Sequence, residues 1–76
     1  MTRTSIRVGQ RLMSWDGRKG YVSLNSRGQR VFGRGEPFLV EWLDYDGTIE
    51  DAQYLTLEQL SDEGIRFGRG VMPWAR

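Results

Sequence analysis

Arginine is the side chain best suited to chemistry in this 76-residue chain, since ten of its eleven basic residues are arginines. The guanidinium group is planar and always charged, and it binds phosphate or carboxylate through two parallel hydrogen bonds. Between positions 16 and 37, basic residues are interleaved with two aromatic side chains, Tyr21 and Phe32, and with glycines typical of exposed turns. We therefore predict a partner-binding surface in the turn at 16–20 and the loop at 25–37. Its residues are Arg18, Lys19, Arg27, Arg30, Phe32 and Arg34.

Acidic residues dominate the middle of the chain, where residues 36–64 contain nine carboxylates and no basic side chain. Residues 1–35 instead carry eight basic residues and one acidic residue, although the net charge of the whole chain is only +1. Tyr45 lies in a predicted turn of the acidic region, and we expect it to be exposed and to add to the partner-binding surface. An aromatic ring among carboxylates can receive a cationic side chain. Alternatively, the oppositely charged halves lie side by side and neutralise each other.

The residue types needed for most catalytic and metal sites are missing. Without cysteine or histidine the chain has no disulfide, no usual zinc ligand and no imidazole base. The acidic pairs Asp44/Asp46 and Glu50/Asp51 could bind a hard cation or exchange protons, but acidic residues in turns are commonly just solvated. The serines show no pairing with a base. We predict no enzymatic activity, no cofactor and no metal.

Short extended segments separated by glycine-containing turns must position these side chains. The segment Phe38–Leu43 is almost continuously apolar, which is typical of a central strand covered on both faces. Irregular alternation in the strand after it predicts a β-bulge near residues 51–52. Glycine and proline interrupt the loop at 25–37, which favours an irregular tip with a short hairpin around 31–32. The predicted strands span 8–15, 21–25, 38–43, 49–55 and 65–67.

One helical turn is predicted at 56–60, between the last two strands. Thr56 can cap it, with Gln59 at the position that completes a capping box. Val22, Leu24 and Val40 are expected to fill the interior, and Trp42 is expected to join this core, although it could instead lie on an acidic binding face with Tyr45.

The chain is long enough for one domain. We assign residues 1–67 to a folded barrel and residues 68–76 to a C-terminal tail, which two glycines and a proline interrupt. The tail is expected to be flexible unless Met72 and Trp74 dock on the body or on a neighbouring molecule. A homo-oligomer would be another route to stability for a core this small. No apolar run approaches the roughly 20 residues that cross a bilayer. We therefore expect no membrane contact and a cytoplasmic location.

The order of these elements resembles the SH3-like small-barrel group, which includes Tudor and KOW modules. The resembling pieces cover residues 8–65 and follow barrel order: strand, turn, strand, long loop, strand, tight turn, strand, helical turn, strand. The resemblance implies an all-β, five-stranded SH3-like barrel with one short helical turn near the C-terminus, and a role in binding peptides or nucleic acids. The pieces are Val8–Leu12, Gly20–Val22, Phe38–Trp42, Asp46–Ile49 and Thr56–Leu60.

An enzymatic relative also has to be considered. Val40-Glu41, Gly47-Thr48-Ile49 and Leu57-Glu58 are similar to segments of the type II, trimethoprim-insensitive dihydrofolate reductases, which are barrels that assemble as tetramers. Those enzymes place a Val-Gln-Ile-Tyr strand at their central pore, whereas this chain reads Ile49-Glu50-Asp51-Ala52. Two carboxylates there would repel a folate tail and an NADP phosphate, so the activity is not carried over.

The sequence thus predicts a non-catalytic binding module. The preferred partner is a protein, which includes a second copy of the chain, and one setting for such a protein is a phage or mobile-element accessory or inhibitor. The alternative is a nucleic-acid-binding barrel that uses its arginine–glycine loop, and the third option is the reductase-like oligomer.

Overall fold

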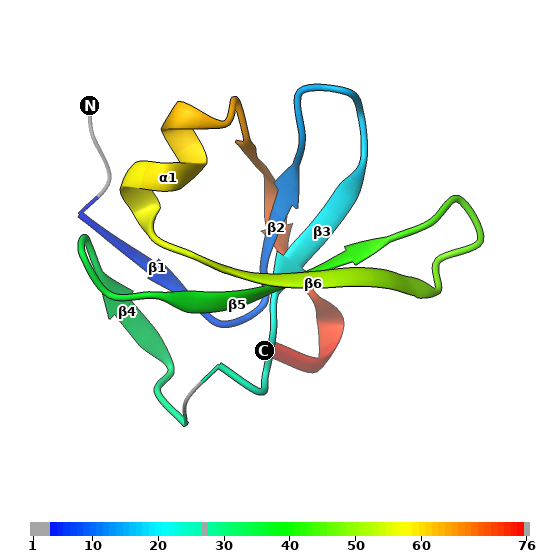
Figure 1. Cartoon of the computed structure of the whole chain (residues 1–76). Coiled ribbons are helices and arrows are strands. Elements are labelled where there is room, and N and C mark those ends of the chain that lie inside the picture. Colours follow the sequence, from blue (N-terminus) through cyan, green and yellow to red (C-terminus); the bar gives the residue numbers. More distant parts are fainter. Residues whose placement is uncertain (1–3, 27, 76) are drawn as a thin grey trace.

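The computed structural model describes residues 4–26 and 28–75 (Figure 1). Within these residues the chain forms short strands, one α-helix and one turn of 3-10 helix. In chain order these are β1 (Ser5–Arg7), β2 (Gln10–Met13), β3 (Lys19–Val22), β4 (Val31–Gly33), β5 (Phe38–Leu43), β6 (Ile49–Leu55), α1 (Leu57–Asp62), β7 (Arg66–Val71) and η1 (Pro73–Ala75).

Five of the strands form one antiparallel sheet in the order β6-β5-β3-β2-β7. In Figure 1, β5 and β6 cross in front of β2 and β3, which run steeply across the view, so the sheet is strongly twisted. The structure confirms the all-β prediction. It does not confirm a closed barrel, because β6 and β7 are the two edges of this sheet and do not pair with each other within the described part of the chain.

The segments β1 and β4 pair with each other in a separate two-stranded ribbon. The register places Ile6 opposite Phe32, and both side chains are about 1% exposed. The sequence predicts no strand before residue 8 and only a small hairpin within the loop at 25–37. The ribbon instead joins chain segments that lie about 25 residues apart, and three residues on each side show too little periodicity to predict it.

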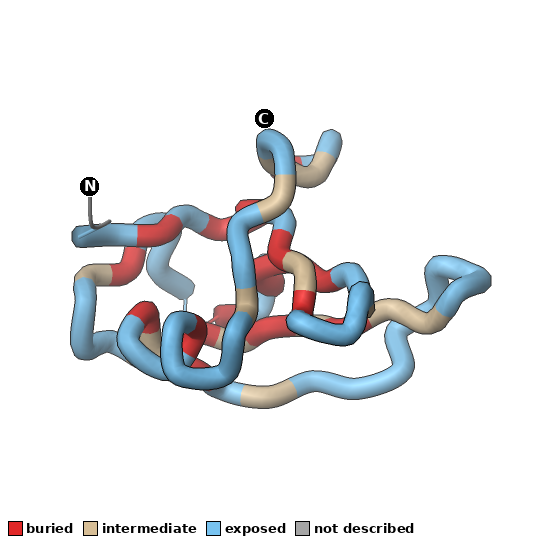
Figure 2. Tube along the Cα trace, turned by 90° about the horizontal axis from the view of Figure 1, so that it is seen from above, coloured by how far each residue is buried: buried red, intermediate tan, exposed pale blue. Residues whose placement is uncertain are grey.

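The hydrophobic core lies between the sheet, the β1–β4 ribbon and α1. In Figure 2 the buried segments gather in the body of the molecule, while the β5–β6 hairpin projects from it and is mostly exposed. Val22, Val40 and Trp42 are buried as predicted. Leu24, which was expected in the interior, is 59% exposed because β3 ends at Val22 and the chain turns after it.

The predicted capping box at α1 is present. The Thr56 hydroxyl accepts a hydrogen bond from the Gln59 amide, and the Gln59 side chain accepts one from the Thr56 amide. Leu57 and Leu60 lie on the buried side of the helix and close one end of the core. Local sequence therefore defines this helix, and two leucines attach it to the sheet.

A β-bulge interrupts β6 one residue before the predicted position. Asp51 pairs with Trp42, whereas Ile49 pairs with Leu43, so Glu50 is an extra residue on β6. A bulge of this kind bends the strand and changes the direction of the extra side chain. Glu50 is thereby displaced from the regular ladder next to Trp42.

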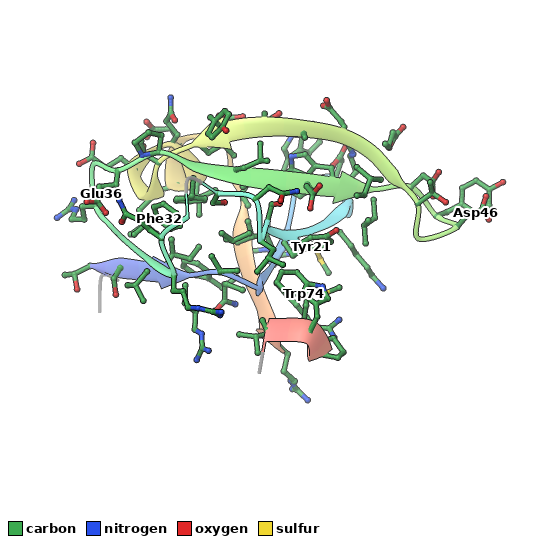
Figure 3. The ribbon with its side chains drawn as sticks, turned by 90° about the horizontal axis from the view of Figure 1, so that it is seen from below. Tyr21, Phe32, Glu36, Asp46 and Trp74 are labelled. Atoms are coloured by element: carbon green, nitrogen blue, oxygen red, sulfur yellow. The ribbon has the colours of Figure 1, made fainter. Side chains whose placement is uncertain are left out.

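Strand β7 extends past residue 67 to Val71, and the 3-10 turn η1 follows at Pro73–Ala75. Ala75 is buried against Gly9, whose backbone has a φ of 90°. A Cβ on Gly9 would lie 2.1 Å from the Ala75 Cβ, so only glycine allows this close approach. Trp74 packs edge-on against Tyr21, with 5.6 Å between ring centroids, and these two residues lie together in Figure 3.

Burial under this segment raises the pKa of the Tyr21 hydroxyl above its ordinary value. The charge of Glu41 and a hydrogen bond to Glu41 act in the same direction. The C-terminal segment therefore covers the outer face of the sheet over β3, while the hairpin end of the same sheet stays open.

Candidate functional site

A groove of about 1090 Å³ lies between the β2–β3 turn and the β5–β6 hairpin. Its walls come from residues 16–19 on one side and from residues 43–47, 50 and 51 on the other. Five carboxylates and two cations line it, so the groove is acidic overall. The charged residues are Asp16, Arg18, Lys19, Asp44, Asp46, Glu50 and Asp51.

Strand register explains why two turns distant in sequence meet at this groove. Lys19, at the start of β3, pairs with Leu43, at the end of β5. Because the strands are antiparallel, the turn that leads into β3 and the hairpin that follows β5 emerge at the same end of the sheet.

Ser14 organises the first wall of the groove. Its hydroxyl accepts a hydrogen bond of 2.9 Å from the Arg18 amide and donates one to the Asp16 carboxylate. The bond from Ser14 holds the pKa of Asp16 below its usual value, and a backbone hydrogen bond from Arg18 acts in the same direction. The hydroxyl of this buried serine therefore fixes the positions of the Asp16 carboxylate and of the Arg18 backbone.

Asp44 organises the second wall. Its Oδ1 accepts hydrogen bonds of 2.9 Å from the amides of Asp46 and Thr48, which closes a turn completed by Gly47 at a φ of 84°. The turn raises Tyr45 to its tip, where the residue is 97% exposed. The carboxylate of Asp44 therefore accepts hydrogen bonds from its own hairpin, whereas Tyr45 and Asp46 are exposed to solvent.

Arg18, which lines the groove, is stacked on the ring of Trp42, and Trp42 itself is not one of the lining residues. The guanidinium carbon of Arg18 lies 5.6 Å from the centroid of the Trp42 ring, within range of a cation–π contact. The same guanidinium pairs with the bulge residue Glu50 at 3.3 Å. The indole also packs against Gly20, where a Cβ would lie 2.6 Å from a ring carbon of Trp42. The indole is 3% exposed.

The structure separates the predicted contact residues into groups. Arg18, Lys19 and Tyr45 share the groove. Arg30 and Arg34 are exposed on either side of β4, away from it. Phe32 was predicted as a contact residue, but it is a core residue 5.8 Å from Phe38, because β4 pairs with β1 and turns that ring inward. Arg27 lies outside the described residues.

Figure 3 shows Phe32 at one end of the molecule and Asp46 at the tip of the hairpin at the opposite end. A second hollow of about 690 Å³ lies by α1 and β7, with Arg34 on its rim. Arg34 is 3.9 Å from Glu58 there, and both side chains are more than half exposed. The basic loop therefore does not extend the groove, and one of its arginines already faces a carboxylate of its own chain.

Sequence reasoning missed the groove as a unit, including the roles of Asp16, Glu50 and Ser14. One signal pointed to it: both turns contain an Asp-Gly pair, at 16–17 and at 46–47, which marks tight hairpins. The sequence did not reveal that β3 pairs with β5, and this pairing brings the two turns together.

Comparisons with known proteins do not assign a family, since no family model, no curated protein and no solved structure matches this chain. Within the described residues, no group of three or more acidic, cysteine or histidine side chains is arranged to hold a metal ion. No helix in the same residues has the length and apolarity needed to span a membrane. The site is therefore interpreted from its own geometry.

Proposed function

We propose that this chain is a non-catalytic protein-binding module of the SH3-like type and that the acidic groove receives a cationic segment of its partner. The proposal keeps a protein as the preferred partner but moves the contact surface from the basic loop to the groove. The observation that carries it is the placement of the fully exposed Tyr45 beside Asp46, at the mouth of a groove with five carboxylates.

The strand order supports the SH3-like part of the proposal. In the sheet, β5 pairs with both β3 and β6, and all three are antiparallel to their neighbours. The helix α1 follows β6, and the last strand, β7, returns to pair with β2. This is the order of the small-barrel group, in which the loops between strands make the binding surface. The groove lies between two such loops.

Charge and exposure support a cationic protein segment as the occupant. Carboxylates at the groove attract positive side chains and speed their association, and an exposed tyrosine can stack on a guanidinium or ammonium group. Phosphates of a nucleic acid would meet repulsion from Asp46 and Glu50. Arg30 and Arg34, which would have to bind them, lie at a different part of the surface.

The proposal is tested with a fluorescein-labelled heptapeptide of alternating glycine and arginine, measured by fluorescence anisotropy. We expect micromolar binding that weakens as salt concentration rises. Tyr45→Ala and Asp46→Asn should each weaken binding several-fold, by up to about tenfold. Asp62→Asn on α1 is the charge control and should leave the affinity unchanged.

Two comparison ligands decide between partner classes. A heptapeptide with glutamate in place of arginine should not bind, whereas a short single-stranded DNA that binds more tightly than the arginine peptide would replace our proposal with the nucleic-acid alternative. In that case Arg30→Ala and Arg34→Ala, and not Tyr45→Ala, should abolish binding. Absence of binding to the arginine peptide at low salt would refute the proposed function.

A further inference from the structure

Arg18 makes the contacts that a bound arginine would make. Its guanidinium lies 5.6 Å from the centroid of Trp42 and 3.3 Å from the carboxylate of Glu50. A planar cation on an aromatic face with a carboxylate beside it is a favourable environment for arginine. A cationic side chain of the chain itself is thus one of the residues that line the groove.

This internal contact is incomplete. Within residues 4–26 and 28–75, the Nε of Arg18 is the one buried side-chain nitrogen or oxygen without a hydrogen-bond partner. Such a group loses its hydration without compensation. The Arg18 side chain is still 37% exposed and its partner Glu50 is 54% exposed, so water reaches the pair and weakens it.

The position of Arg18 in the chain would let its side chain move away from Trp42. It directly precedes β3, and the hydrogen bond that its backbone amide donates to the Ser14 hydroxyl does not involve its side chain. Rotation of the side chain into solvent would uncover one face of Trp42 and release Glu50 without breaking a backbone pair of the sheet.

We infer that Arg18 is an internal competitor and that the groove accepts an arginine side chain of a protein partner, which displaces Arg18 from Trp42 and Glu50. The inference rests on the proposed function and specifies the chemistry of the partner. The bound arginine would lie on Trp42 and pair with Glu50, while Tyr45 and Asp46 at the rim contact the rest of the segment. The measured affinity is then lowered by the fraction of time for which Arg18 fills the site.

The decisive comparison is Arg18→Ala against Lys19→Ala, using the arginine–glycine heptapeptide. Each variant removes one positive charge from the same groove, so general electrostatics change equally, but only Arg18 covers Trp42. We expect the peptide to bind Arg18→Ala about tenfold more tightly than wild type, and Lys19→Ala no more than about twofold more tightly. A peptide with lysine in place of arginine should gain less from Arg18→Ala, because ammonium lacks the planar fork.

A second measurement uses the unaltered protein, in case Arg18→Ala is poorly folded. In nitrogen-15 NMR spectra, the Nε–H signal of Arg18 should exchange slowly with water in the free protein. Addition of the peptide should shift that signal and make its exchange faster as the side chain moves into solvent.

The outcomes separate this inference from the proposed function. If wild type binds the peptide while Arg18→Ala binds like Lys19→Ala or more weakly, and the Arg18 signal does not move, Arg18 is a structural cover and the inference is wrong, but the groove remains the binding site. If neither wild type nor the two variants bind the peptide, the proposed function and the inference are both wrong.

Discussion

Two aromatic rings at opposite ends of the core are buried by different means. Phe32 is enclosed by apolar neighbours, among them Phe38 and Ile6. Trp42 is buried to nearly the same extent and belongs to the same hydrophobic cluster, but the charged side chain of Arg18, paired with Glu50, also lies over its ring. Apolar packing is stable because opening it exposes hydrocarbon to water, whereas a half-exposed ion pair contributes little. One end of the core is therefore closed by apolar packing alone, and we propose that the other end opens for binding.

The largest expected effect tests the apolar end. Phe32→Ala should lower the free energy of unfolding by about 3–5 kcal/mol, because it leaves a cavity beside Phe38. The comparison is Tyr45→Ala at the exposed hairpin tip, which should change stability by no more than about 0.5 kcal/mol. Both are measured by urea denaturation. If Phe32→Ala lowers the free energy of unfolding by less than about 1 kcal/mol, Phe32 lies on the surface and is again a candidate contact residue.

The next effect tests the packing beneath Trp42. Gly20→Ala would place a Cβ 2.6 Å from the Trp42 ring and 2.9 Å from the carbonyl oxygen of Glu41, so the ring or the strand must move. We expect a loss of about 1–3 kcal/mol in urea denaturation. Gly35→Ala is the matched control, since its added methyl group would meet no side chain within 4 Å, and it should cause no loss. Equal stability of the two variants would show that Trp42 is loosely held.

A smaller effect is expected at α1, which closes the apolar end. Thr56→Ala removes the hydroxyl that accepts from the Gln59 amide, and it should lower stability by about 1 kcal/mol. Thr48→Ala, at an exposed position of the hairpin, provides the control and should have a negligible effect. If both threonine variants unfold at the same urea concentration, the capping box contributes nothing and the two leucines alone hold the helix.

The smallest effect on stability is expected for Arg18→Ala, although we expect this variant to have the largest effect on binding. Loss of a half-exposed ion pair and of its stacking contact should lower stability by at most about 1 kcal/mol, and by less at high salt. The measurement is urea denaturation at low and high salt. A loss of about 3 kcal/mol or more would show that Arg18 is part of the core, and the contrast between the two ends would disappear.

Local patterns predicted several elements well. The strands at 38–43 and 49–55 have the predicted bounds, because apolar β-forming residues end at an Asp-Gly turn. The helix after Thr56 was predicted from its capping box. The pairing of β1 with β4 was not predicted, since neither segment carries a periodic signal long enough to read. The inward orientation of Phe32 depends on that pairing and was missed with it.

The candidate site was predicted only in fragments. Arg18, Lys19 and Tyr45 were chosen for their charge, their aromatic ring and their position in turns, and all three line the groove. Their grouping with Asp16, Asp46 and Glu50 depends on the register between β3 and β5 and on a bulge at one residue. A shift of register by one residue would turn every side chain of a strand to the opposite face, so residue types alone could not reveal this arrangement.

The sequence by itself determined the two strands at 38–43 and 49–55, the sites of the tight turns, the capped helix and the separation of basic and acidic segments along the chain. These properties follow from interactions between residues that are close in sequence. Only the tertiary structure decided that Phe32 faces the core, that Arg18 lies between Trp42 and Glu50, and that two hairpins form one acidic groove. Those contacts join residues more than twenty positions apart in most cases, and they exist only when packing has selected one strand register among several that local chemistry allows.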